Sequence, residues 1–181
     1  MLVKALINID YTFDFIEGAL PCGDPGIKIE KAITQITRQF IEEGHFTVFA
    51  IDLHTEKDSY HPETELFPPH NIKGTEGRNL YGSLKEVYEQ FKVRNNVYWM
   101  DKTRYSAFAG TDLEIKLNER NIKDIHLVGV CTDICVLHTA VDAYNKGYNL
   151  YIHEKATASF NEAGHIWALN HFKSTLGAAI L

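Results

Sequence analysis

The chain has 181 residues, 45% of them hydrophobic, and its formal net charge of −6 argues against a nucleic-acid partner. The length predicts a single domain over residues 1–181, and no apolar run approaches the ~18 residues of a membrane span or has the form of a signal peptide. The cysteines, Cys22, Cys131 and Cys135, are too few for a secreted disulfide framework, so we expect a cytoplasmic protein without membrane contact.

Strands and helices alternate along the chain in the manner of repeated βαβ units. Apolar runs predict strands at residues 2–10, 46–53, 95–100, 124–130 and 149–154. Apolar residues at helical spacing, with capping signals at several ends, predict helices at residues 28–44, 111–120, 133–146 and 161–175. Right-handed crossovers between such strands give a mainly parallel, Rossmann-like sheet covered by helices on both faces. The predicted fold class is therefore three-layer α/β/α.

Chemically reactive side chains follow the carboxyl ends of the predicted strands, where parallel α/β sheets bind their ligands. These are Asp10, residues 52–54, Lys102 and residues 131–135. A long irregular stretch, residues 54–80, follows the second strand, and loops of this length are uncommon unless they are functional. We expect the functional site at this edge of the sheet.

Cys135 lies in the first turn of the predicted helix 133–146. Unpaired N–H groups and the positive dipole at a helix start stabilise a thiolate and lower the thiol pKa, and the same N–H groups can hold an oxyanion. The alternative is that Cys135 is a small buried hydrophobic residue. Cys131 is interpreted as a small residue at a tight turn, because the C-x₃-C spacing differs from the C-x₂-C of redox sites.

A cysteine nucleophile requires a base. Asp10 and Lys102 are better candidates than His138, because a carboxylate near a lysine and a thiol forms a coupled set whose proton can move. The positive charge of Lys102 would also lower the thiol pKa. A lone helical histidine such as His138 is more often structural, and Asp10 and Lys102 could equally be structural charges.

A second group of polar residues indicates a metal site. Asp52 and His54 are two residues apart at the end of a strand, so their side chains project from the same face. The following loop adds further possible ligands, namely His61, Glu63, Glu65 and His70. Carboxylates and histidines with open positions for water suit Zn²⁺, Mn²⁺ or Fe²⁺. The alternative is a polar surface loop rich in histidine.

Short motifs follow one another along the chain. They are "DYTFDF" (residues 10–15), "DLH" (52–54), "FPPHNIKGTEG" (67–77), "KTRYSAF" (102–108) and "GVCTDICV" (129–136). On these motifs the chain resembles the isochorismatase-like cysteine hydrolases, and within them the nicotinamidases, over nearly its whole length. The resemblance implies the fold of that family. Thr12 stands where the family usually has glutamine, and Cys131 where alanine is more common.

The resemblance implies a catalytic triad of Asp10, Lys102 and Cys135. Asp10 would take the thiol proton and pass it to the departing ammonia, while Lys102 would hold the charge balance. Backbone N–H groups of Cys131 and Cys135 would form an oxyanion hole beside a cis peptide bond between Val130 and Cys131.

The resemblance also implies the metal and substrate residues. The metal ligands would be Asp52, His54, His70 and either His61 or Glu63; we favour Glu63 because a carboxylate better balances a divalent charge. Aromatic side chains would enclose a pyridine ring, with the substrate-binding residues being Phe15, Phe67, Tyr105 and Cys131.

The implied activity is hydrolysis of nicotinamide to nicotinate and ammonia in NAD salvage, through a cysteine thioester, with pyrazinamide cleaved as well. One divalent ion, with zinc favoured over manganese or iron, would be the cofactor, and a homo-oligomer is expected. An isochorismatase activity is disfavoured, because those enzymes lack the nucleophilic cysteine. The alternatives are another small-amide hydrolase of the family, or a non-enzymatic metal-binding or redox protein with a Cys131–Cys135 disulfide.

Overall fold

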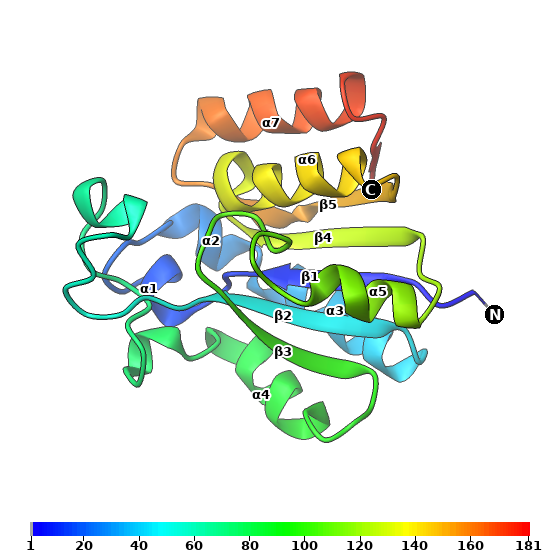
Figure 1. Cartoon of the computed structure of the whole chain (residues 1–181), viewed down its shortest axis with the longest axis horizontal. Coiled ribbons are helices and arrows are strands. Elements are labelled where there is room, and N and C mark those ends of the chain that lie inside the picture. The colour runs from blue at the N-terminus through cyan, green and yellow to red at the C-terminus, as the bar shows by residue number, and fades with distance from the viewer. Residues whose placement is uncertain (1) are drawn as a thin grey trace.

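The computed structural model describes residues 2–181, and their central sheet has six parallel strands (Figure 1). The strands lie in the order β3-β2-β1-β4-β5-β6. Their bounds are β1 Ala5–Ile9, β2 Phe46–Asp52, β3 Val97–Lys102, β4 Asp124–Val130, β5 Asn149–Ala158 and β6 Ala179–Ile180. This order confirms the predicted Rossmann-like sheet and places its switch point between β1 and β4, where open α/β sheets bind their ligands.

Helices cover both faces of the sheet (Figure 1). The helices are α1 Phe13–Ile16, α2 Asp24–Lys28, α3 Glu30–Glu42, α4 Gly82–Phe91, α5 Leu113–Glu119, α6 Leu137–Asn145 and α7 Glu162–Ser174. Shorter turns are η1 Pro62–Glu65, η2 Glu76–Arg78 and the π-helical turn η3 Thr132–Val136. One apolar cluster joins α5, α6 and α7 to the sheet, and a second joins α1, α3 and α4 to the opposite face. The three-layer arrangement is thus confirmed.

Several boundaries differ from those predicted. Helix α4 was not predicted; it buries Leu84, Val87 and Phe91, but its other positions are polar and it follows an irregular stretch. The predicted helix 28–44 corresponds to α3, Glu30–Glu42, and the short helix α2, Asp24–Lys28, precedes it without having been predicted. The fifth strand continues to Ala158, because a register shift in its pairing with β4 lets the ladder resume beyond the charged residues 154–155. The apolar tail adds the short strand β6.

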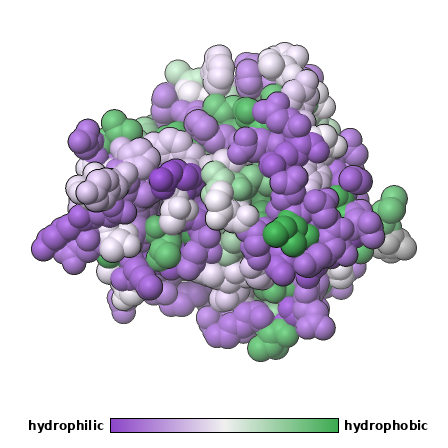
Figure 2. Space-filling view, in the orientation of Figure 1, coloured by the Kyte–Doolittle hydropathy of each residue, from purple (hydrophilic) through white to green (hydrophobic). Residues whose placement is uncertain are grey.

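The irregular stretch 54–80 gathers at the carboxyl end of the sheet, at the left of Figure 1 and away from the N-terminus. The face in Figure 2 is mainly hydrophilic, with hydrophobic residues in small separate groups, as on ordinary protein surfaces. Within residues 2–181, no helix has the length and apolar character needed to cross a membrane. The loops over the strand ends are therefore the place to examine for a site.

Candidate active site

Three buried charged residues meet where β1, β2 and β3 end. The Nζ atom of Lys102 lies 2.7 Å from Asp10 Oδ2 and 2.6 Å from Asp52 Oδ1, and all three side chains are fully buried. Asp52 and Lys102 are register partners on neighbouring strands, which explains their closeness. Asp10 has a φ of 55° and accepts a hydrogen bond from the Asp52 backbone N–H at 2.8 Å. The parallel sheet thus brings together three residues far apart in sequence.

Cys135 lies beside this group, in the turn η3 that follows β4. One carboxylate oxygen of Asp10, one of Asp52 and the Cys135 Sγ atom lie within 4.8 Å of one another. The peptide bond between residues 130 and 131 is cis, as the resemblance implied, and all three cysteines are free thiols. Gly129 allows β4 to approach β1 here, because a Cβ at this residue would overlap the Ile9 carbonyl. The structure therefore brings the three proposed triad residues together.

The pKa of the Cys135 thiol differs from the lowered value that the sequence predicted, and its charged neighbours are shifted as well. Burial raises the pKa of the Cys135 thiol well above its usual value, and the attraction of Lys102 only partly offsets this effect. Burial and the neighbouring Asp52 charge raise the pKa of Asp10 to about 6. Burial alone would lower the pKa of Lys102, but the two carboxylates hold it well above its usual value. Burial thus favours the protonated form of the Cys135 thiol, which is opposite in direction to the lowered pKa predicted from the sequence.

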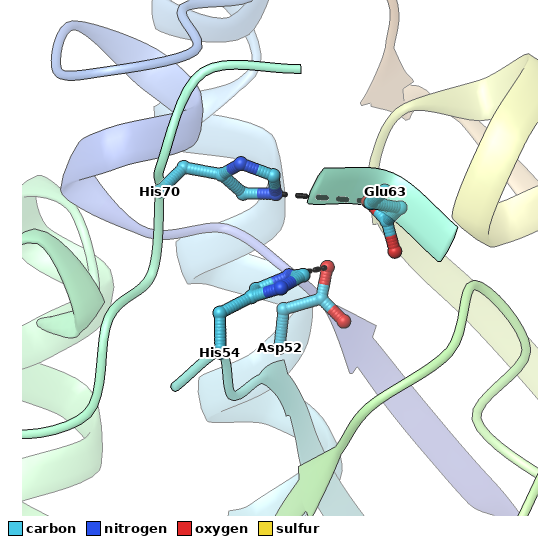
Figure 3. A group of neighbouring side chains, drawn as sticks. All are labelled: Asp52, His54, Glu63 and His70. Carbon is cyan, nitrogen blue, oxygen red and sulfur yellow. Dashed lines mark ion pairs between the residues drawn. The ribbon is translucent and has the colours of Figure 1, made fainter. Parts of the chain in front are cut away.

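Four further side chains converge beside the triad (Figure 3). Asp52, His54, Glu63 and His70 each offer one ligand atom, and these atoms lie within 4.8 Å of one another. The two ring Nε2 atoms lie 3.9 Å from Asp52 Oδ2 and 3.7 Å from Glu63 Oε2, respectively. These side chains come from the end of β2, the segment just after it, the turn η1 and the stretch that follows η1. All four are buried, which is unusual for a polar loop.

The donor set fits a divalent cation. Asp52 Oδ2, His54 Nε2 and His70 Nε2 are buried, yet they have no hydrogen-bond partner within residues 2–181. His70 donates from Nδ1 to the Pro68 carbonyl at 2.8 Å, which leaves the Nε2 lone pair free for a metal. Burial and the nearby Asp52 charge raise the pKa of Glu63 to about 7, so a cation held by these residues would stabilise the charged form of Glu63. Two histidines and two carboxylates suit Zn²⁺, Mn²⁺ or Fe²⁺.

His61 does not join this set. Its Nε2–H donates to the Thr103 carbonyl at 2.7 Å, and its Nδ1 accepts the Glu63 backbone N–H at 3.2 Å. Both ring nitrogens are therefore engaged in holding the turn η1, which presents Glu63 to the other ligands. Of the two alternatives from the sequence, the geometry favours Glu63.

One pocket connects the thiol to the metal-ligand set. It is lined by Phe15, Leu20, Glu63, Phe67, Tyr105, Cys131, Ile134, Cys135 and Phe160. The pocket therefore includes all four residues that the resemblance assigned to substrate binding. Leu20, Ile134 and Phe160 were not predicted; only Ile134, which precedes the cysteine, carried a sequence signal. His138 does not line the pocket; its exposed ring donates to the Ile134 carbonyl and packs against Tyr105 with ring centroids 5.2 Å apart.

Comparison with known proteins gives a consistent result. The family model described as the isochorismatase domain matches residues 4–181. The chain is 62% identical over 179 residues to the isochorismatase-family protein PncA of Bacillus subtilis, with 98% of each chain covered. Its structure matches that of the nicotinamidase/pyrazinamidase PncA from Bacillus subtilis with a TM-score of 0.97 and 61% identity, covering 98% of both chains. It also matches the pyrazinamidase of Pyrococcus horikoshii in complex with zinc, with a TM-score of 0.85, 28% identity and 98% of both chains covered. The chain belongs to the isochorismatase family.

Proposed function

We propose that this protein hydrolyses nicotinamide to nicotinate and ammonia through a thioester on Cys135. The observation that carries the proposal is a pocket bordered both by Cys135, with Asp10 and Lys102 behind it, and by the metal-ligand residue Glu63. The nicotinamidase/pyrazinamidase names of the similar structures support the substrate class. Pyrazinamide, which has a similar ring and the same amide, is expected to be cleaved as well.

The mechanism follows from the protonation of the resting site. Asp10, with a pKa of about 6, is a carboxylate at neutral pH and accepts the thiol proton as the Cys135 sulfur attacks the amide carbon. Backbone N–H groups of Cys131 and Cys135 stabilise the oxyanion. Asp10 then gives the proton to the departing ammonia, and afterwards takes a proton from the water that cleaves the thioester and returns it to the sulfur. Lys102, paired with Asp10 at 2.7 Å, keeps that carboxylate oriented throughout.

The metal-ligand residues complete the site. Asp52, His54, Glu63 and His70 would hold one divalent ion, which supplies a coordination position for the pyridine nitrogen of the substrate. Phe15 and Phe67 line the same pocket and would enclose the ring. Zinc is the favoured ion, because the similar pyrazinamidase from Pyrococcus horikoshii was solved in complex with zinc.

Ammonia release from nicotinamide tests the proposal directly. Release should fall when a chelator strips the metal and return when Zn²⁺ or Mn²⁺ is added. Cys135→Ala should abolish release while metal content stays unchanged, whereas the matched variant Cys131→Ala, which keeps the backbone N–H, should remain active. Clear residual activity in Cys135→Ala would rule out the thioester.

A panel of other small amides separates this proposal from a different specificity within the family. Metal binding with no turnover of any amide would instead favour a non-enzymatic metal-binding protein. A role in NAD salvage and a cytoplasmic location follow from the proposed substrate. The homo-oligomer stays a prediction, which light scattering on the purified protein can check.

A further inference from the structure

Asn71 directly follows the proposed ligand His70 and has an unusual backbone. It is fully buried and has a φ of 45°, in the left-handed region that few residues other than glycine adopt. A buried residue keeps such a conformation only where its surroundings determine it, and such residues concentrate at functional sites. The partners of Asn71 therefore show what determines the direction of the chain at His70.

Three hydrogen bonds hold Asn71 from different sides. Its backbone N–H donates to Asp14 Oδ2 at 2.8 Å, and its side-chain Oδ1 accepts from the Thr12 hydroxyl at 3.0 Å. Its carbonyl accepts the backbone N–H of His54 at 3.1 Å. Asn71 thus connects the segment after β1, which also carries Asp10, to both proposed histidine ligands.

The His54 side of this connection is a short parallel ladder. The His54 carbonyl accepts the backbone N–H of Lys73 at 2.9 Å, so the chain around His54 pairs with the chain just after Asn71. This pairing brings the two imidazoles close together (Figure 3), and their ring centroids are 4.4 Å apart. The relative position of the two ligands therefore depends on where Asn71 is held.

Two glycines leave space for the carboxylate of Asp14 that binds the Asn71 backbone. A Cβ at Gly77 would overlap Asp14 Oδ2, and a Cβ at Gly18 would lie 2.5 Å from Asp14 Oδ1. The second carboxylate oxygen accepts the Ala19 backbone N–H at 3.2 Å, so the carboxylate is itself fixed in place. Two glycines from different segments thus allow one carboxylate to hold Asn71.

We propose that Thr12, Asp14 and Asn71 are positioning residues that set the metal affinity of the site by fixing His54 and His70. The inference rests on the proposed metal site, but it concerns residues that touch neither metal nor substrate. Residues that orient metal ligands in this way typically change affinity ~10–100-fold when they are substituted. The hydrogen bond to Asn71 also gives a role to Thr12, the threonine in "DYTFDF".

Thr12→Val tests the proposal, because it removes the hydroxyl and nearly keeps the shape. Thr37→Val is a matched control: Thr37 is also fully buried and donates to an asparagine, Asn8 Oδ1, at 2.8 Å, but it lies on α3. The Zn²⁺ dissociation constant is measured by competition with a fluorescent chelator, and thermal unfolding is followed in excess chelator. We expect Thr12→Val to weaken Zn²⁺ binding about tenfold or more, Thr37→Val to lower only the unfolding temperature, and Thr12→Ser to restore affinity.

Asp14→Asn provides a second variant, since it keeps the side-chain size but replaces one acceptor by a donor. It should also weaken Zn²⁺ binding. Wild-type affinity in both Thr12→Val and Asp14→Asn would overturn the proposal, as would an equal loss of affinity in Thr37→Val. Failure of the wild type to bind any Zn²⁺ is a different result, which would overturn the metal site itself.

Discussion

The buried ammonium of Lys102 can be removed without a large change of shape by the substitution Lys102→Met. The variant leaves the carboxylates of Asp10 and Asp52 facing each other with oxygens within 4.8 Å. At an effective dielectric constant of ~20, two unit charges at that distance repel by roughly 3 kcal/mol or more. Removing one partner of a buried ion pair typically costs ~3–5 kcal/mol. Both estimates predict that Lys102→Met loses a few kcal/mol of unfolding free energy near neutral pH.

The loss of unfolding free energy in Lys102→Met should become smaller as the pH falls. Without Lys102, the pKa of Asp10 in the folded protein rises further above the ~3.9 of an unfolded aspartate, and the pKa of Asp52, which Lys102 and His54 hold below its usual value, rises as well. A raised carboxyl pKa means that the folded state binds more protons, so the variant regains stability as the pH falls. Urea unfolding in excess chelator should therefore show a smaller difference from the wild type near pH 6 than near pH 7.5.

A double variant provides the control for this reasoning. Lys102→Met with Asp10→Asn removes one of the two facing charges and should recover a substantial part of the lost unfolding free energy. Both variants should be inactive towards nicotinamide, because the base is altered in each. A destabilisation that is independent of pH, or that the second substitution does not relieve, would show that packing of the lysine stem, and not charge, dominates.

Other groups give further expectations. Since burial raises the pKa of Asp10 to about 6, the residual kcat/KM of the chelator-treated protein should fall about tenfold per pH unit below that value, and a flat profile down to about pH 5 in that protein would contradict Asp10 as the base. A Cβ at residue 164 would overlap the carboxylate of Asp133, which belongs to η3, the turn that carries Cys135. Gly164→Ala should therefore lower the free energy of unfolding in urea by ~1–3 kcal/mol and lower kcat. Burial lowers the pKa of His126 to about 3 and of His153 to about 4, so their stabilisation is present above about pH 6.5 and lost as the pH falls towards 4. Acid titration of His126→Gln should show less of that loss.

The strand-end residues of the site could be predicted because a parallel sheet obeys a simple geometric rule. Asp10, Asp52 and Lys102 each stand at or just after the end of an apolar run, and parallel strands bring such ends to one edge. The proximity of His54 followed from its two-residue spacing from Asp52. Patterns of this kind predict where a residue lies in the fold, because they depend on backbone geometry alone.

Properties that depend on burial and on loop conformation were not predictable. The thiol pKa of Cys135 was expected to be low from the helix start and the lysine, but burial of the thiol outweighs both effects. The choice of Glu63 over His61 required knowing that both nitrogens of His61 bind elsewhere. Leu20 and Phe160 reach the pocket from irregular segments in which no periodic pattern marks an inward-facing side chain.

The charges of the whole site explain why the triad and the metal-ligand set share a residue. Asp52 Oδ1 accepts a hydrogen bond from Lys102 at 2.6 Å, while its buried Oδ2 lies 3.9 Å from His54 Nε2 and has no hydrogen-bond partner among residues 2–181. Asp10, Asp52 and Glu63 together carry three negative charges against the single positive charge of Lys102, and all are buried. A divalent cation would neutralise this excess, and proton uptake compensates part of it otherwise, as the raised pKa values of Asp10, Glu63 and His54 indicate. Metal binding should therefore lower the pKa of Asp10, so that the acid limb of kcat/KM moves to lower pH in the metal-loaded protein.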